Sequence, residues 1–182
     1  GNENWSVYHH SMGAGSMINL DLDDAKGTSS VYFNNTEPTN NLFTVGTHNS
    51  VNENNTYFIS YNWTAIPGFS AFGKYTGTGD ADTGQFCYTG FLPKFLLVKR
   101  TDSSAGANWG MVDSARSPFN KVNDFLYADI NDDEADEGNY HAFDFLSNGF
   151  KPRGSYPTTN TSGGTYIYCA FASNPFKTAR AR

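Results

Sequence analysis

The densest group of chemically active side chains in the sequence is the acidic stretch at residues 129–139. Calcium binds about six to eight oxygen atoms, and alternating Asp and Asn side chains in a loop can supply several of them. Asp129, Asn131 and Asp133 alternate in this way and are the candidate Ca²⁺ ligands. The spacing departs from the EF-hand pattern, in which a glycine occupies the sixth position. A solvated acidic loop without a metal is therefore the alternative interpretation.

The sequence contains no recognisable arrangement for catalysis. Asp21 and Asp23 form a carboxylate pair of the kind that can hydrolyse glycosidic bonds, but any acidic chain contains such pairs. Neither a Gly-x-Ser-x-Gly nucleophile turn nor a phosphate loop ending in Gly-Lys-Ser/Thr occurs. His9 and His10 are adjacent and would face opposite sides of a strand, which disfavours a histidine metal cluster. We therefore predict that the chain is not an enzyme and needs no cofactor other than, at most, calcium.

Aromatic side chains near polar turns are the candidates for binding a ligand. Tyr and Trp rings can stack on sugar rings while nearby Asn and Asp side chains bind hydroxyl groups. Trp63, Tyr88, Tyr140 and Tyr156 occur in such surroundings and are the predicted glycan-binding residues. Burial in a core is the alternative for each of them, because aromatic residues in strands most often pack inside.

Composition narrows the class of protein. Aromatic residues make up 16% and charged residues 16% of the 182 residues, and Asn, Gly, Thr and Ser supply much of the rest. This mixture favours short strands joined by many turns. The net charge of −6 would repel a polyanion, so nucleic acid is an unsuitable partner. No apolar run is long enough to predict a membrane-spanning helix.

The two cysteines carry little chemical information. Cys87 and Cys169 lie in apolar runs that resemble strands, and they lack the spacing of a metal site. We expect two buried free thiols, with a single disulfide as the alternative.

Hydrophobic periodicity predicts an all-β fold, because sustained helical spacing is almost absent. Turn residues separate the apolar runs at intervals of roughly ten residues, which is typical of an antiparallel β-sandwich. Residues 119–127 are predicted to form a helical turn. The predicted strands are residues 5–9, 17–22, 31–34, 42–46, 56–63, 71–76, 85–89, 95–100, 109–113, 141–145, 149–151 and 165–172.

Internal similarity predicts two related repeats in tandem. Trp5 aligns with Trp109, and residues 54–61 align with residues 163–170. Residues 67–69 then align with residues 174–176, which keeps the offset nearly constant. The matching positions of the two tryptophans favour burial for both.

The predicted division is a truncated first repeat at residues 1–73 and a complete second repeat at residues 74–182. The first repeat lacks the strands that precede Trp109 in the second repeat. An incomplete sandwich exposes sheet edges, so we expect the missing strands to come from elsewhere in a longer polypeptide or from another chain.

An ordered set of motifs also resembles a known family. The motifs are residues 5–10, 33–39, 42–46, 68–77, 88–102, 113–116, 144–151 and 164–176. They resemble the C-terminal repeat region of bacteriophage tail or tail-fibre proteins, especially those of phages that infect marine bacteria. In such proteins this region follows a laminin-G-like (concanavalin-like) domain. The resemblance implies a virion location and no catalytic residues, and it does not extend to the acidic stretch at residues 129–139.

Together these features predict a structural protein of a phage tail or fibre that attaches to a glycan on the host surface. Its expected partners are other virion proteins and further copies of itself, with a trimer favoured by analogy. After release of the virus it would be extracellular. A polysaccharide depolymerase is the enzymatic alternative, and a pure scaffold or decoration domain of the virion is the third interpretation.

Overall fold

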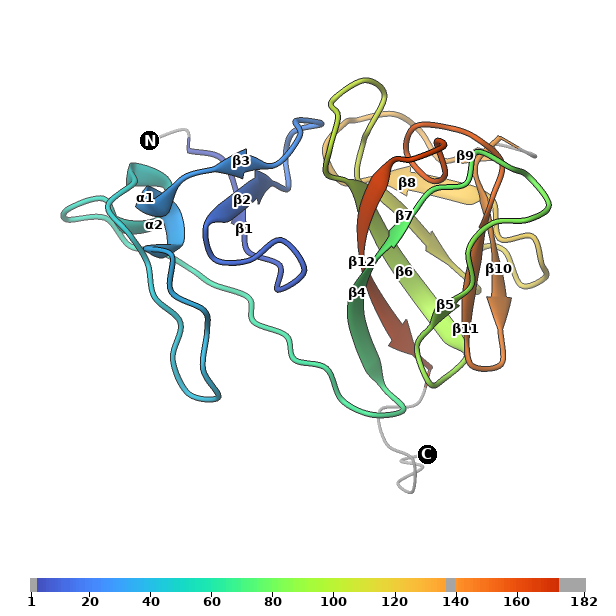
Figure 1. The fold of residues 1–182 in the computed structure, drawn as a ribbon, viewed down its shortest axis with the longest axis horizontal. Helices are drawn as coiled ribbons and strands as arrows, with labels where there is room; N and C mark the ends of the chain where they lie inside the picture. The colour runs from blue at the N-terminus through green and yellow to red at the C-terminus, as the bar shows by residue number, and fades with distance from the viewer. Residues whose placement is uncertain (1–2, 137–139, 174–182) are drawn as a thin grey trace.

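The structure is a computed structural model that describes residues 3–136 and 140–173, and it is nearly all β (Figure 1). A small N-terminal unit precedes a larger sandwich. The N-terminal unit contains β1 (Ser6–Val7), β2 (Ser16–Asn19), β3 (Gly27–Thr28), α1 (Ser30–Phe33) and α2 (Asn49–Asn52). The sandwich contains β4 (Ser70–Thr76), β5 (Cys87–Tyr88), β6 (Pro93–Arg100), β7 (Gly110–Asp113), β8 (Asp124–Tyr127), β9 (Ala135–Asp136), β10 (Ala142–Leu146), β11 (Gly149–Arg153) and β12 (Thr165–Ala172).

Two antiparallel sheets form the sandwich. The larger sheet has the order β4-β12-β6-β7-β8-β9, and the smaller one has the order β10-β11-β5. Side chains from both sheets meet in one apolar core, which confirms the predicted all-β antiparallel sandwich. The members of this core that are at most 2% exposed are Tyr75, Leu96, Val98, Val112, Val122, Phe125, Phe143, Phe150, Tyr166 and Ala170.

The strand β12 shows why these residues form a sheet. Its side chains alternate between the two faces, so Tyr166 and Ala170 lie in the core while Ile167 lies on the opposite face. Both of its edges are paired, with β4 on one side and β6 on the other. The predicted strands at residues 71–76, 85–89, 95–100, 109–113, 141–145, 149–151 and 165–172 are confirmed in β4, β5, β6, β7, β10, β11 and β12.

The N-terminal unit packs on the outer face of the larger sheet. Ile18 of β2 shares an apolar cluster with Trp109 and Ile167 of the sandwich. The indole Nε1 of Trp109 also donates a hydrogen bond to the carbonyl oxygen of Asn19 at 2.7 Å. This contact joins a side chain of the sheet to the backbone of the N-terminal unit.

Removing that hydrogen bond tests the packing of the two parts. We expect Trp109→Phe to lower the free energy of unfolding by about 1.5 kcal/mol, because the Asn19 carbonyl loses its donor. Urea unfolding at neutral pH measures the change. Trp5→Phe is the matched control and should change stability by less than about 0.5 kcal/mol, since Trp5 is largely exposed. Equal stability of the two variants would contradict the assigned contact.

Two predicted elements have a different type of secondary structure in the protein. Residues 31–34 are not a strand: α1 forms there because the Ser29 side chain accepts the Val31 N–H, and Asn34 ends the helix with a positive φ of 51°. Residues 119–127 are not a helical turn, since β8 occupies the second half of this range. The backbone of β8 pairs with β7, which satisfies its hydrogen bonds in a sheet.

Residues 42–46 and 56–63 form no strand, although the sequence predicts one in each. Residues 54–61 are irregular and exposed, whereas their sequence match at residues 163–170 contains most of β12.

Trp109 is buried at 4% exposure as predicted, but the same prediction is wrong for Trp5, which is 51% exposed. The predicted boundary between residues 73 and 74 falls inside β4. Residues 174–176 lie outside the described residues, and the tandem repeat stays a prediction.

Cys87 and Cys169 are free thiols. Cys87 is buried as predicted, while Cys169 on β12 is only partly buried. Burial raises the pKa of both thiols to about 12, so both stay protonated at neutral pH.

Candidate aromatic binding surface

A row of three exposed aromatic rings lies between the N-terminal unit and β4. The Tyr61 ring stacks with both Trp5 and Trp63, with 6.2 Å between ring centroids in each pair. The interplanar angles are 23° and 22°, so Tyr61 is nearly parallel to each of its two neighbours. Trp5, Tyr61 and Trp63 are 51%, 61% and 66% exposed. We call these three side chains the aromatic row.

Two hydrogen bonds hold the backbone of Trp5. The Trp5 N–H donates to the Asp21 carboxylate at 2.9 Å, and the Trp5 carbonyl accepts from the Leu20 N–H at 2.9 Å. Tyr61 and Trp63 are two residues apart in an extended segment, so their side chains lie on the same side of it. The row therefore combines a ring held by the N-terminal unit with two rings from the segment that leads to β4.

The turn that follows this segment holds its C-terminal end. Ile66 and Ser70 exchange backbone hydrogen bonds of 3.0 and 3.1 Å across a tight turn at Pro67 and Gly68. Gly68 has a φ of 79°, a conformation that glycine adopts without the strain of a side chain. In Figure 1 the segment before this turn runs as a long strand-free trace from the N-terminal unit to the start of β4.

Other large apolar side chains are exposed in two segments that precede Tyr61 in the sequence. They lie in residues 42–45, which precede α2, and in residues 57–59, which precede the row. Monomeric soluble proteins rarely expose so many apolar groups in short stretches unless a partner covers them. The exposed side chains are Leu42, Phe43, Val45, Tyr57, Phe58 and Ile59.

The structure separates the four predicted glycan-binding residues. Trp63 belongs to the aromatic row, whereas Tyr88 is exposed on β5 of the smaller sheet. Tyr156 packs on the ring of His141 with 3.7 Å between centroids, and Tyr140 is exposed next to that histidine in sequence. Within the part of the chain that the structure describes, no ring contact joins Trp63 to the other three. The four residues therefore do not form a single platform.

The candidate calcium ligands also have different surroundings. The Oδ1 atom of Asp129 accepts the Trp109 N–H at 3.0 Å, and burial raises the pKa of its carboxyl group. The positive charge that lies near Asp129 is the ammonium group of Lys99. Asn131 and Asp133 are exposed. Over residues 3–136 and 140–173, no group of three or more His, Cys, Asp or Glu residues is arranged to hold a metal ion. Calcium binding stays a prediction, and residues 137–139 of the acidic stretch lie outside the described residues.

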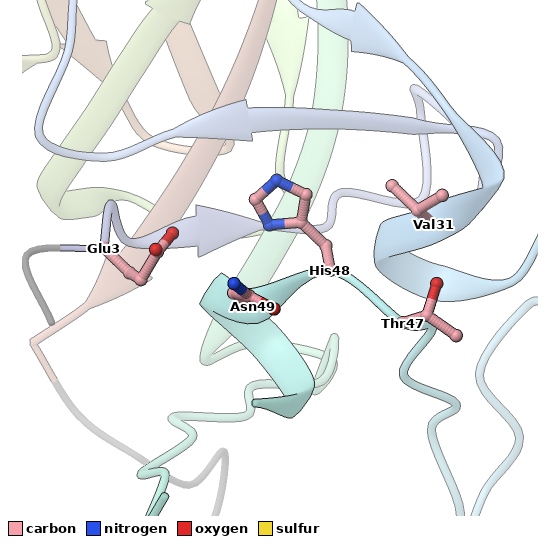
Figure 2. A pocket seen from close by; sticks show the side chains of 5 residues that line it. All are labelled: Glu3, Val31, Thr47, His48 and Asn49. Carbon is pink, nitrogen blue, oxygen red and sulfur yellow. The ribbon is translucent and has the colours of Figure 1, made fainter. Parts of the chain in front are cut away.

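A pocket of about 370 Å³ opens on the N-terminal unit, and Figure 2 shows the side chains around it. Both ring nitrogens of His48 are engaged, one with the Tyr32 hydroxyl at 3.2 Å and one with the Ser50 hydroxyl at 2.9 Å. Among the described residues, Glu3 is the one carboxylate in the lining, whereas glycoside hydrolysis uses two. The lining residues are Glu3, Val31, Thr47, His48 and Asn49.

Two of the three rings in the row were missed by the sequence reasoning. Tyr61 could have been found from its spacing, since Tyr61 and Trp63 alternate with the polar residues Ser60 and Asn62. The position of Trp5 depends on the packing of the N-terminal unit, and no local signal indicates it.

The chain is thus a β-sandwich with an N-terminal unit, and its aromatic row is exposed to solvent. The chain belongs to the family described as a domain of unknown function (DUF7483), whose family model matches residues 1–175. No curated protein and no solved structure matches the chain significantly. No helix within the described residues is long and apolar enough to cross a membrane.

Proposed function

We propose that this protein is an attachment domain of a bacteriophage tail or fibre, and that it binds a glycan on the host surface through the aromatic row. The observation that carries this proposal is the stacking of Tyr61 with both Trp5 and Trp63, with more than half of each side chain exposed. The tail or fibre location rests on the family resemblance of the sequence motifs.

The chemistry of the row suits a saccharide. Indole and phenol rings offer flat apolar faces, and their polar edges remain hydrated. Each contact of this type is weak, and several copies of the domain in one virion would add their affinities through multivalency.

Binding to purified host-surface polysaccharides tests the proposal. We expect Trp63→Ala to weaken binding about tenfold, which corresponds to about 1.4 kcal/mol of lost stacking. Isothermal titration calorimetry or a glycan array measures the affinity. Tyr88→Ala is the matched control, because Tyr88 is an equally exposed ring outside the row. Its affinity should stay within about twofold of the wild type.

Other outcomes identify other functions. An equal loss in both variants, or none in Trp63→Ala, would remove the row from the binding site. New reducing ends released from the polysaccharide, and lost when carboxylates are replaced, would favour a depolymerase. Absence of glycan binding together with tight binding to another virion protein would favour a scaffold.

A further inference from the structure

The segment at residues 56–65 has the sequence of a β-strand but no strand partner. From Tyr57 onward its odd-numbered residues are Tyr57, Ile59, Tyr61 and Trp63. The even-numbered positions 60, 62 and 64 are Ser, Asn and Thr, and Phe58 is the exception to the alternation. This period-two alternation is typical of a strand with one apolar face and one polar face. The stacking of Tyr61 and Trp63 shows that two odd-numbered side chains already lie on one side.

The backbone of this segment is unpaired. Among the described residues, no backbone–backbone hydrogen bond involves residues 55–65. The contacts of the segment come instead from side chains, such as the Ser70 hydroxyl that donates to the Thr64 carbonyl at 2.7 Å. An extended stretch with open N–H and C=O groups is a template for pairing with another strand. Exposed β-branched and aromatic residues increase that tendency.

Pairing with β4 conflicts with the observed contacts. The segment leads directly into β4, which is an edge strand hydrogen-bonded to β12 alone. To lie along β4, the segment would have to leave Trp5, on which Tyr61 stacks. At the far end of that edge, the Thr76 N–H is already bonded to the Gln85 side chain at 3.1 Å. Pairing with β4 would therefore break the aromatic row, whereas pairing with a strand of another molecule leaves it intact.

We propose that residues 57–63 pair with the same residues of a second copy of this chain, antiparallel about a two-fold axis that passes beside Ser60, so that Tyr61 opposes Ile59 and Trp63 opposes Tyr57. An isologous contact of this kind needs no second surface, because a strand is always complementary to itself in antiparallel orientation. Directly opposed residues share a face, so the rings of both copies lie on one side of the two-stranded ribbon. The two aromatic rows then form one longer platform, and each copy contributes half of it.

This pairing extends the proposed function from one chain to a dimer. The glycan-binding role of the longer platform rests on the proposed function. The exposed Tyr57 and Ile59 side chains gain cross-strand neighbours, while Ser60 and Asn62 face solvent on the other side. A ribbon that carries two rows binds a longer stretch of polysaccharide than one row does. The partner copy completes the site, and affinity for long chains depends on the dimer.

The mass of the protein in solution tests the pairing. We expect light scattering to report twice the chain mass of 20.0 kDa. Consecutive N–H groups of a strand point to opposite edges of the strand. The double variant Ile59→Pro with Ser60→Pro therefore removes one N–H group that would face the partner, whichever of the two edges is paired. This variant is expected to be monomeric. All three rings of the row remain in it. Asn40→Pro, in another exposed loop, is the control and should stay dimeric.

These measurements test the strand pairing separately from the glycan-binding function. A monomeric wild type, a trimer, or a dimer that persists in the double proline variant would overturn the pairing. Amide hydrogen exchange adds a second readout, because protection of residues 57–63 should rise with protein concentration. Protection that is independent of concentration would show pairing inside one chain and would also overturn it. A dimer that binds no polysaccharide would leave the pairing intact and remove the glycan function.

Discussion

Replacing Lys99 with methionine is expected to lower the free energy of unfolding by about 3 kcal/mol. Lys99 is fully buried on β6, and its ammonium group donates to the carbonyl oxygens of Asp23 at 2.8 Å and Ala107 at 2.6 Å. Methionine occupies a similar volume but has no donor, so both carbonyls lose their partner. Because Asp23 belongs to the N-terminal unit, the loss also weakens the attachment of that unit to the sheet.

The buried charge of Asp129 enlarges this effect. Burial lowers the pKa of Lys99 to about 8, while the nearby carboxylates, Asp129 first among them, favour its charged form. Without the ammonium group, Asp129 is left as a half-buried carboxylate without a nearby cation. The Oδ2 atom of Asp129 has no hydrogen-bond partner among the described residues, which makes its charge more dependent on Lys99.

A double-mutant cycle separates the two contributions. Asp129→Asn keeps the oxygen that accepts the Trp109 N–H and removes the charge. With Asp129→Asn in place, Lys99→Met should cost about 1 kcal/mol less than it does in the wild type. Urea unfolding of the four proteins at pH 7 gives the coupling energy. Additive effects would mean that the ammonium group acts through its two carbonyl contacts alone.

The strands of the sandwich could be predicted because their pattern is local. In β12 the alternation of Tyr166, Ile167 and Tyr168 matches the period of a strand that separates a core from an outer face. Where a side chain competes with the pattern, prediction fails: the Ser29 cap turns the strand-like Val-Tyr-Phe sequence of α1 into a helix. In β8, pairing with β7 overrides a sequence that shows no clear period, and such pairing is not visible in a local window.

The site was predicted less completely than the fold. Trp63 was identified from its type and its polar surroundings, but a ring becomes part of a row only through its neighbours. Trp5 reaches Tyr61 because the backbone of Trp5 is bonded to residues 20 and 21, which belong to the turn after β2. Contacts between residues so far apart in sequence depend on tertiary packing, for which one sequence gives no local signal.

Acidification is expected to destabilise the protein strongly, with most of the loss between about pH 6.5 and pH 4. Burial lowers the pKa of His9 to about 4 and that of His141 to about 4, from an ordinary value of 6.5. Because the unfolded chain binds protons at higher pH than the folded chain, stability is complete above pH 6.5 and is lost as the pH falls toward 4. Each histidine accounts for about 3 kcal/mol at the limit.

The surroundings of the two histidines explain why both resist protonation. His9 lies between the N-terminal unit and β12, where its Nε2 contacts the Tyr168 carbonyl at 3.2 Å and its Nδ1 accepts the Ser11 N–H at 3.1 Å. A second proton would have to replace the Ser11 contact, and the neighbouring His10 adds repulsion. His141 is almost fully buried against the Phe125 and Tyr156 rings.

Variants assign the acid sensitivity to these two side chains. Glutamine keeps a neutral polar group, so His9→Gln and His141→Gln should each reduce the slope of unfolding free energy against pH between pH 6.5 and 4. Asp129 acts in the opposite sense, because its raised pKa lets the folded chain bind a proton first. Urea unfolding at several pH values measures these slopes, and an unchanged slope in both His9→Gln and His141→Gln would place the acid sensitivity elsewhere.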